Sequence, residues 1–323
     1  MLRPLKFILK NQLKLEKSKR EKKIDGFTLI ELLVGMILAA LVITPLLGLM
    51  INVLKTDRDE QAKSNSEQEL KSAVDYISQD LQQAVYIYDQ NGLNPPPDGI
   101  QDQIPPQKAV PGCNDIATCT PVLVFWKRKL LPDSIPVGGG ANDTFVYSLV
   151  AYYLVETPDN TWSNAARIGR FEIRGGVAGA RPPFDEADEG FAALDLTGAG
   201  SLQNKMNAWQ SAADPFTQQA EVLIDYIDIP DPDINEAPNN TPPGGITCDT
   251  TNPDASLLEQ RVPENPDINS FYACVNSTKN YARVYIRGNA QARIQQDITQ
   301  RNYRSTFFPT ATIQVEGKSS LPQ

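Results

Sequence analysis

The sequence predicts an α+β fold in which a long N-terminal helix packs on an antiparallel β-sheet. The helix is predicted because residues 32–54 contain no charged side chain and because apolar residues then recur every three or four positions between Leu70 and Tyr88. The sheet is predicted because short runs rich in Val, Ile, Tyr and Phe follow residue 120, separated by Gly, Pro, Asn and Asp. Four segments result: a basic leader at 1–26, an apolar helix at 27–54, a neck and amphipathic helix at 55–90, and a β-rich globular domain at 91–323.

Charge is distributed unevenly along the 323-residue chain, whose net charge is −9. Residues 1–26 carry nine Lys/Arg and three Asp/Glu, a net of +6, so the remainder carries 21 basic and 36 acidic residues, a net of −15. An acidic body of this kind favours solubility and repels nucleic acid and anionic lipid. We therefore expect no nucleic-acid partner.

The uncharged run at residues 32–54 is long enough to cross a membrane. As a helix it would span roughly 35 Å, which exceeds the hydrocarbon thickness of a bilayer. Because the basic residues precede this run, the positive-inside rule places the leader in the cytoplasm and the chain after Lys55 in the periplasm or outside the cell. The expected location is therefore the inner membrane, with a single pass.

Two common kinds of membrane signal do not account for this segment. A cleavable signal peptide needs small residues after its apolar core, but here the core ends in Met50-Ile51-Asn52-Val53-Leu54-Lys55. An ordinary signal anchor explains the leader and the apolar run but not Glu31. Although the helix dipole favours an acid in the first turn, an intramembrane carboxylate normally has a partner, and the sequence of this helix offers none.

The segment Gly26-Phe27-Thr28-Leu29-Ile30-Glu31-Leu32-Leu33-Val34 resembles the class III signal of type IV pilins and type II secretion pseudopilins. The shared pattern is a glycine, an aromatic residue directly after it, a glutamate at the fifth position and a long apolar run, all after a basic leader. The resemblance implies that a prepilin peptidase cleaves after Gly26 and N-methylates Phe27. It also implies that Glu31 neutralises the N-terminal amine of a neighbouring subunit, so that its counter-charge lies on another chain.

The same resemblance implies the partners and the assembled state. The expected partners are the prepilin peptidase, other pilin or pseudopilin subunits and an inner-membrane assembly platform, and the expected product is a pilus or pseudopilus. Pro45 removes one backbone hydrogen bond and should kink the helix. In the family a proline here marks where the helix bends or melts on assembly, and a simple tolerated kink is the alternative.

Beyond the membrane the helix is expected to continue to about residue 88. Residues 55–66 are polar on all sides and predict an exposed neck, whereas the apolar positions from Leu70 to Tyr88 predict a buried face. A helix over 27–88 would be roughly 90 Å long. The pilin-like resemblance implies that its second half packs on a sheet.

The strands of the globular domain are expected at 122–126, 144–155, 168–173, 221–229, 281–286 and 311–315. They should form one antiparallel sheet or two, packed on the helix. Two long connections, at 176–220 and 230–280, exceed the usual length of a structureless loop, so each is expected to be functional or tied by a disulfide.

The four cysteines are Cys113, Cys119, Cys248 and Cys274. An even number in an exported domain predicts two disulfides. Pairing of near neighbours, Cys113 with Cys119 and Cys248 with Cys274, is the favoured one of three possible connectivities. Four reduced, buried thiols would be the alternative.

The composition argues against several common kinds of catalytic site. Histidine is absent, which excludes Ser-His and Cys-His catalysis and His-ligated metals. The sequence contains no C-x-x-C, P-loop or G-x-G-x-x-G motif. A pair of carboxylates of the glycosidase kind stays open in so acidic a chain, but nothing singles out a pair. We expect no catalytic residue, no metal and no cofactor.

One acidic run offers calcium as the alternative to that expectation. Its carboxylates are Asp225, Asp228, Asp231, Asp233 and Glu236. Oxygen-rich loops suit calcium, and some related pseudopilins hold it in their globular domains. The run lacks the glycine and the spacing of an EF-hand, so a solvated acidic loop is the favoured interpretation.

The features together predict a non-enzymatic filament subunit. The chain resembles the larger minor pseudopilins of the PilW or J type, because its Pro-rich, cysteine-bearing C-terminal half departs from short major pilins. That size favours a minor, tip-located role in secretion or motility. The alternative is a single-pass anchor that displays a periplasmic binding or hydrolytic domain.

Overall fold

The computed structural model describes residues 26–157, 161–197, 199–229, 244–295 and 305–318. The basic leader up to residue 25 lies outside the described residues. The chain divides into two compact units, residues 1–57 and 58–323. Helix α2 (Leu29–Gln82) contributes residues to both units.

The first unit contains the apolar part of α2. Its side chains from Phe27 to Leu54 are all exposed, and Phe27 itself is 85 % exposed. By length and composition α2 is able to cross a membrane. Because the exposed surface is apolar all round, it needs a cover of lipid or of other helices.

Pro45 lies inside α2, and the helix continues on both sides of it. Pro45 has no N–H to donate to the preceding turn. Next to it, the Thr44 hydroxyl donates a hydrogen bond to the carbonyl of Ala40, at 2.7 Å. The kink expected at Pro45 stays a prediction.

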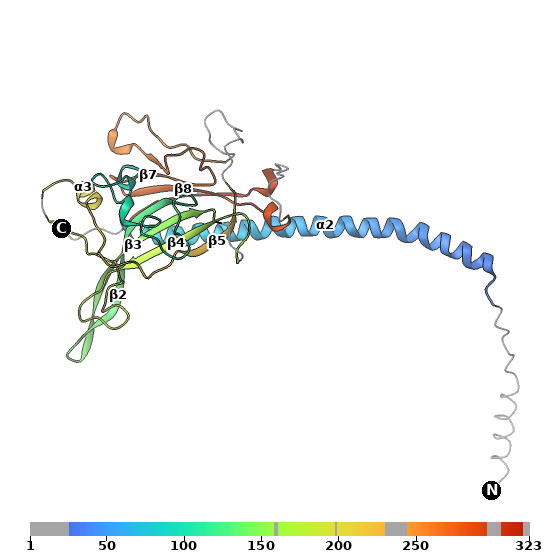
Figure 1. Cartoon of the computed structure of the whole chain (residues 1–323), viewed down its shortest axis with the longest axis horizontal. Coiled ribbons are helices and arrows are strands. Elements are labelled where there is room, and N and C mark those ends of the chain that lie inside the picture. The colour runs from blue at the N-terminus through green and yellow to red at the C-terminus, as the bar shows by residue number, and fades with distance from the viewer. Residues whose placement is uncertain (1–25, 158–160, 198, 230–243, 296–304, 319–323) are drawn as a thin grey trace, which may run out of the picture. The chain divides into compact units, whose positions relative to one another are not determined.

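The second unit contains two antiparallel sheets in which sequence neighbours pair (Figure 1). The first sheet consists of β1 (Ala84–Ile87), β2 (Cys119–Val137), β3 (Gly140–Val155), β4 (Ala166–Arg174) and β5 (Glu221–Ile227). The second consists of β6 (Gln260–Val262), β7 (Phe271–Asn276), β8 (Tyr281–Arg287) and β9 (Thr310–Glu316). A long N-terminal helix with antiparallel sheets confirms the α+β, pilin-like fold.

Short helices lie in the connections between the strands. The α-helix α3 spans Leu202–Asn207, and single 3₁₀ turns occur at Asn91–Leu93, Gln101–Gln103, Ala255–Leu257, Gln291–Arg293 and Ser305–Phe307. Ser201 caps α3, because its side chain accepts a hydrogen bond from the N–H of Asn204.

The C-terminal part of α2 packs into the core of the second unit. Its buried apolar residues, Leu70, Ala73, Val74, Ile77 and Leu81, belong to one continuous apolar cluster with residues of both sheets. The spacing of three and four residues predicted this buried face correctly up to Leu81.

A buried carboxylate attaches the last turns of α2 to the first sheet. Asp80 is charged, yet it is only 7 % exposed. One of its oxygens accepts from Nζ of Lys127 at 3.1 Å. The other accepts from the hydroxyl of Tyr152 at 2.7 Å and from Nε of Arg170 at 2.8 Å. Asp80 therefore connects α2 to three adjacent strands, β2, β3 and β4.

The helix ends at Gln82, so the prediction that it continues to Tyr88 is wrong. Ala84–Ile87 instead forms β1, which pairs with β2 around Phe125 and Trp126 and is buried throughout. Apolar positions at 81, 84 and 88 fit a helical period, but a consecutive run containing Val, Tyr and Ile also fits a buried strand. Pairing with β2 decides in favour of the strand.

The two long connections contain more structure than expected. The connection at 230–280 includes β6 and β7, so its interpretation as a loop is wrong. The apolar residues of β7 follow Ser270 directly and are all buried. The connection at 176–220 contains α3 and packs on the first sheet through Trp209, whose ring lies 5.3 Å from that of Trp126.

Strands β2 and β3 are longer than expected and extend as a two-stranded arm (Figure 1). The arm pairs as far as Val137 with Gly140, beyond the parts that pair with β1 and β4. Its turn is Gly138-Gly139, and Gly139 has a φ of +111°, a conformation that favours glycine. The Gly-Gly pair is a hairpin signal that the sequence carries.

We predict that Asp80→Asn lowers the free energy of unfolding by about 3 kcal/mol, because it leaves Lys127 and Arg170 with less buried counter-charge. Unfolding of the mature chain in detergent, followed by the near-ultraviolet circular dichroism of the buried tryptophans, measures the change. Asp75→Asn on the same helix, at an exposed position, is the control and should change it little. Equal effects of the two substitutions would contradict the role given to Asp80.

Candidate assembly site and polar cleft

The N-terminal end of α2 is closed by a reciprocal pair of side chains. The backbone N–H and the hydroxyl of Thr28 donate to one carboxylate oxygen of Glu31, at 3.1 and 3.0 Å. In return the N–H of Glu31 donates to the hydroxyl of Thr28, at 3.3 Å. This arrangement is a capping box, and the Thr-x-x-Glu spacing that predicts it is present in the sequence.

The capping box corrects the expectation that Glu31 has no partner on its own helix. Thr28 supplies two hydrogen bonds to its carboxylate, and the helix dipole adds a favourable interaction. Among residues 26–57, however, the structure places no basic side chain on Glu31. The carboxylate is thus held at the start of the helix, next to Phe27, with its charge still available to a cation.

The site therefore combines a glycine–phenylalanine junction, a fixed carboxylate and an exposed apolar helix. Residues 22–47 match the prokaryotic N-terminal methylation motif. The match covers the junction at Gly26 and Phe27, the carboxylate of Glu31 and the position of Pro45. Comparison with curated proteins and with solved structures found no match for the chain.

The motif supports a type IV pilin or pseudopilin that is processed by a prepilin peptidase and assembles with other pilin subunits. Together with the apolar helix it fits a membrane-anchored, single-pass protein. The match ends at residue 47, so it carries no information about the globular unit.

Both disulfides pair near neighbours, as the sequence favoured. Cys113 is joined to Cys119, the first residue of β2, and Cys248 is joined to Cys274 of β7. The second disulfide lies beside Glu259, and these three residues are close enough to surround a metal ion. The two sulfurs are bonded to each other, however, and Glu259 accepts hydrogen bonds from Arg283 and Tyr281. These atoms are therefore engaged within the protein.

The carboxylates weighed as calcium ligands have protein partners where they are described. Asp225 accepts from the N–H and the hydroxyl of Ser163, at 2.9 and 2.7 Å. Asp228 is buried and lies 3.6 Å from Arg287, so a solvated loop does not describe it. The other three candidates, Asp231, Asp233 and Glu236, lie outside the described residues.

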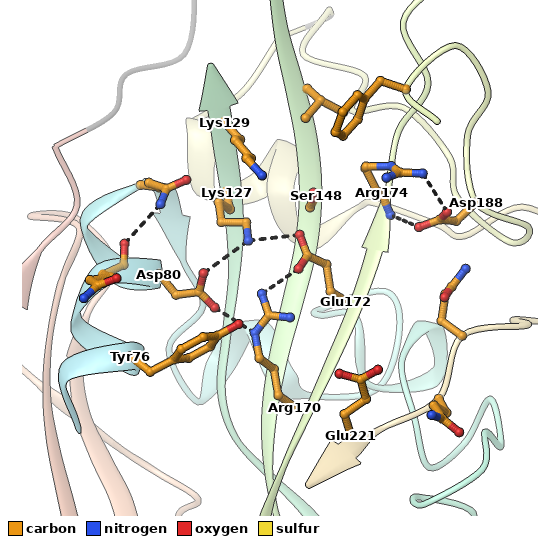
Figure 2. Close-up of a pocket in the computed structure, with 16 residues that line it drawn as sticks. Tyr76, Asp80, Lys127, Lys129, Ser148, Arg170, Glu172, Arg174, Asp188 and Glu221 are labelled. Atoms are coloured by element: carbon orange, nitrogen blue, oxygen red, sulfur yellow. Dashed lines mark hydrogen bonds and ion pairs between the residues drawn. The ribbon is translucent and has the colours of Figure 1, made fainter. Parts of the chain in front are cut away.

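A polar cleft of about 670 Å³ lies beside the end of α2 (Figure 2). It is lined by α2, by β2, β3 and β4, by part of the 176–220 connection and by the beginning of β5. The lining residues are Tyr76, Gln79, Asp80, Gln83, Lys127, Lys129, Val146, Ser148, Arg170, Glu172, Arg174, Phe184, Asp188, Gln218, Gln219 and Glu221. Sequence reasoning missed this cleft because its walls come from segments far apart in the chain.

Four charged side chains form a closed network on the floor of the cleft, as Figure 2 shows. Lys127 lies 3.1 Å from Asp80 and 3.0 Å from Glu172. Arg170 lies 2.8 Å from Asp80 and 2.5 Å from Glu172. Each cation therefore bridges both carboxylates, which holds all four side chains in fixed positions.

The network changes how its members titrate. Burial alone would raise the pKa of Glu172, but Arg170 and Lys127 outweigh burial and lower that pKa to about 2. Burial, reinforced by the charge of Asp80, raises the pKa of Tyr152 well above its ordinary value. At neutral pH Glu172 is therefore ionised and Tyr152 remains a hydrogen-bond donor.

The pKa of Glu172 predicts how Glu172→Gln alters stability with pH. Because the pKa falls on folding, from 4.5 to about 2, the carboxylate stabilises the folded state above pH ~4.5, and this contribution disappears as the pH falls towards 2. At pH 7 we expect Glu172→Gln to lower the free energy of unfolding by on the order of 2 kcal/mol. The difference from the unsubstituted chain should shrink below pH ~4.5.

Denaturant titrations of the mature chain in detergent, repeated between pH 7 and pH 3, measure this difference. Glu221→Gln, at an exposed position of the same cleft, is the matched control and should show no such pH dependence. A difference that stays constant across the pH range would rule out the network as its cause.

Proposed function

We propose that this protein is a minor pilin or pseudopilin subunit that is cleaved after Gly26, methylated on Phe27 and assembled into a type IV pilus-like or type II secretion-like filament. One observation carries the proposal: the N-terminal methylation motif coincides with a carboxylate held in the first turn of a helix whose next residues, 32–54, are exposed and uncharged. Cleavage after Gly26 would create an amine at Phe27, and Glu31 would then be the fifth residue of the cleaved chain. A neighbouring subunit would then supply the cation that Glu31 lacks.

Physical chemistry explains why such a contact would guide assembly. An amine and a carboxylate attract strongly in a medium of low dielectric constant, although desolvation offsets much of the gain. The contact therefore fixes the register between helices, while burial of the apolar side chains from Leu29 to Leu54 supplies affinity between them. The capping box prepares this contact because it restricts Glu31 before a partner arrives.

The finer assignment follows from the globular unit. Its size, its two disulfides and its acidic charge favour a periplasmic or extracellular minor subunit at the tip, similar to the PilW or J type. The filament would dock on an inner-membrane assembly platform and serve secretion or motility. Polysaccharide is the cargo we favour, on a resemblance to the hormogonium polysaccharide secretion pseudopilin of filamentous cyanobacteria. We propose no enzymatic activity and no cofactor.

The polar cleft supports a second candidate function, a membrane anchor that displays a periplasmic binding or hydrolytic domain. In that case the leader would remain attached and Glu31 would serve only as a helix cap. The state of the N-terminus separates the two candidates.

Mass spectrometry of the protein from its native membrane should find a chain that begins with N-methylated Phe27. The uncleaved form should accumulate when Gly26 is replaced by a bulky residue, because a large side chain would then lie directly before the cleavage site. A native chain that still begins at Met1 would refute processing and leave the anchored domain.

Glu31→Ala should leave membrane insertion intact, because it removes a charge from an apolar segment. Incorporation into filaments should fall at least tenfold, a change that corresponds to about 1.4 kcal/mol. Quantitative immunoblotting of sheared filaments against whole membranes measures it. Glu67→Ala, at an exposed position in the second unit, is the control, and normal incorporation of the Glu31 variant would remove Glu31 from assembly.

A further inference from the structure

We infer that the polar cleft beside the end of α2 is a binding site for an oligosaccharide segment. The inference adds a ligand site to the subunit proposed above, and it rests on that proposal only for its biological setting. The volume of the cleft, about 670 Å³, lies within the range of ligand-binding pockets. Unlike most such pockets it is lined mainly by polar side chains, which selects a ligand rich in hydroxyl groups.

Side-chain amides supply the first set of contacts. Four glutamines line the cleft: Gln79 in α2, Gln83 directly after it, and Gln218 and Gln219 in the segment before β5. Each amide offers both a donor and an acceptor, the combination that a hydroxyl group requires. Among the described residues, the amide groups of Gln79, Gln218 and Gln219 have no hydrogen-bond partner within the protein.

An exposed aromatic ring supplies the second set of contacts. Tyr76 lines the cleft and is 44 % exposed, although Ala73 and Asp80, one turn before and after it on α2, are buried. Its ring lies 5.6 Å from the guanidinium of Arg170, and Figure 2 shows the two side by side. A sugar ring has an apolar C–H face and a polar rim, so it fits an aromatic surface that adjoins hydrogen-bonding groups.

The charges of the cleft favour a ligand with little net charge. The lining holds four basic side chains, Lys127, Lys129, Arg170 and Arg174, and four acidic ones, Asp80, Glu172, Asp188 and Glu221. Most are already paired with each other, including Arg174 with Asp188 at 3.4 Å. A nucleotide or another polyphosphate would need an excess of basic groups, and a lipid would need apolar walls.

The charged network also prepares the cleft for binding. Because Lys127, Arg170, Asp80 and Glu172 fix one another, their outward-facing atoms do not have to be ordered when a ligand arrives. The low pKa of Glu172 keeps its carboxylate ionised as an acceptor, which suits hydroxyl recognition rather than proton donation.

Binding to neutral hexasaccharides tests the inference, with uronic-acid-containing hexasaccharides as the charged comparison. The mature full-length chain in detergent micelles is screened against both sets, and the tightest ligand is titrated by calorimetry. Tyr76→Ala and a Gln79→Ala/Gln219→Ala double variant should each weaken binding at least tenfold. Two matched controls should stay within twofold: Trp162→Ala, an aromatic 41 % exposed outside the cleft, and Gln82→Ala, on α2 but not in the lining.

Thermal unfolding of each variant shows whether a loss of binding is a loss of folding. Absence of binding to the neutral set would overturn the inference, and so would binding that the cleft variants leave unchanged. Capture of peptides instead of sugars, with the same dependence on Tyr76, would also overturn it in favour of a protein-docking site. Each result is independent of N-terminal processing and filament incorporation, so the site and the subunit role can fail separately.

Discussion

The buried carboxylate of Asp80 is the constraint on which the second unit depends. It lies near the C-terminal end of α2 and accepts hydrogen bonds from side chains of three successive strands. A buried charge tolerates few alternative arrangements, because each donor that moves away leaves part of that charge unsolvated. Asp80 therefore selects one rotation and one axial position of the helix on the sheet, whereas the apolar side chains beneath it would accept several. The same interaction forms the floor of the cleft, so helix docking and cleft geometry are coupled.

Two carboxylates on α2 illustrate two ways of holding a charge away from water. Asp80 is neutralised entirely within the chain, by Lys127 and Arg170. Among the described residues Glu31 accepts hydrogen bonds from the neutral donors of Thr28, so they orient its charge without compensating it. The Asp80 interaction thus lies within the second unit, whereas Glu31 is the carboxylate for which we propose a counter-charge on a neighbouring molecule.

Much of the architecture could be predicted from local sequence patterns. The uncharged run, the helical spacing from Leu70 and the alternating strands are local signals, and they located α2, four of the five strands of the first sheet and two of the four strands of the second. The sequence also carries the signals of the capping box at Thr28 and Glu31 and of the Gly138-Gly139 turn. The transition from α2 to β1 cannot be located from the sequence, because the run from Leu81 to Tyr88 fits both a helical and a strand period, and only its pairing with the strand that contains Trp126 distinguishes them. Asp80 and the cleft depend on contacts between residues 47 to 90 positions apart, which spacing alone does not reveal.

The arm formed by β2 and β3 affects how closely copies of this chain could pack in the proposed filament. A hairpin that extends past its sheet presents two unpaired edges, which normally invite strands from other molecules. Here Pro132 and Pro136 lack the N–H groups that such pairing needs, and the register shifts between Leu131 and Ile135. The carbonyl of Ser134 is already occupied by the N–H of Arg181. Along its β2 edge the arm can therefore lie close to other copies of the chain without pairing with them into a continuous sheet.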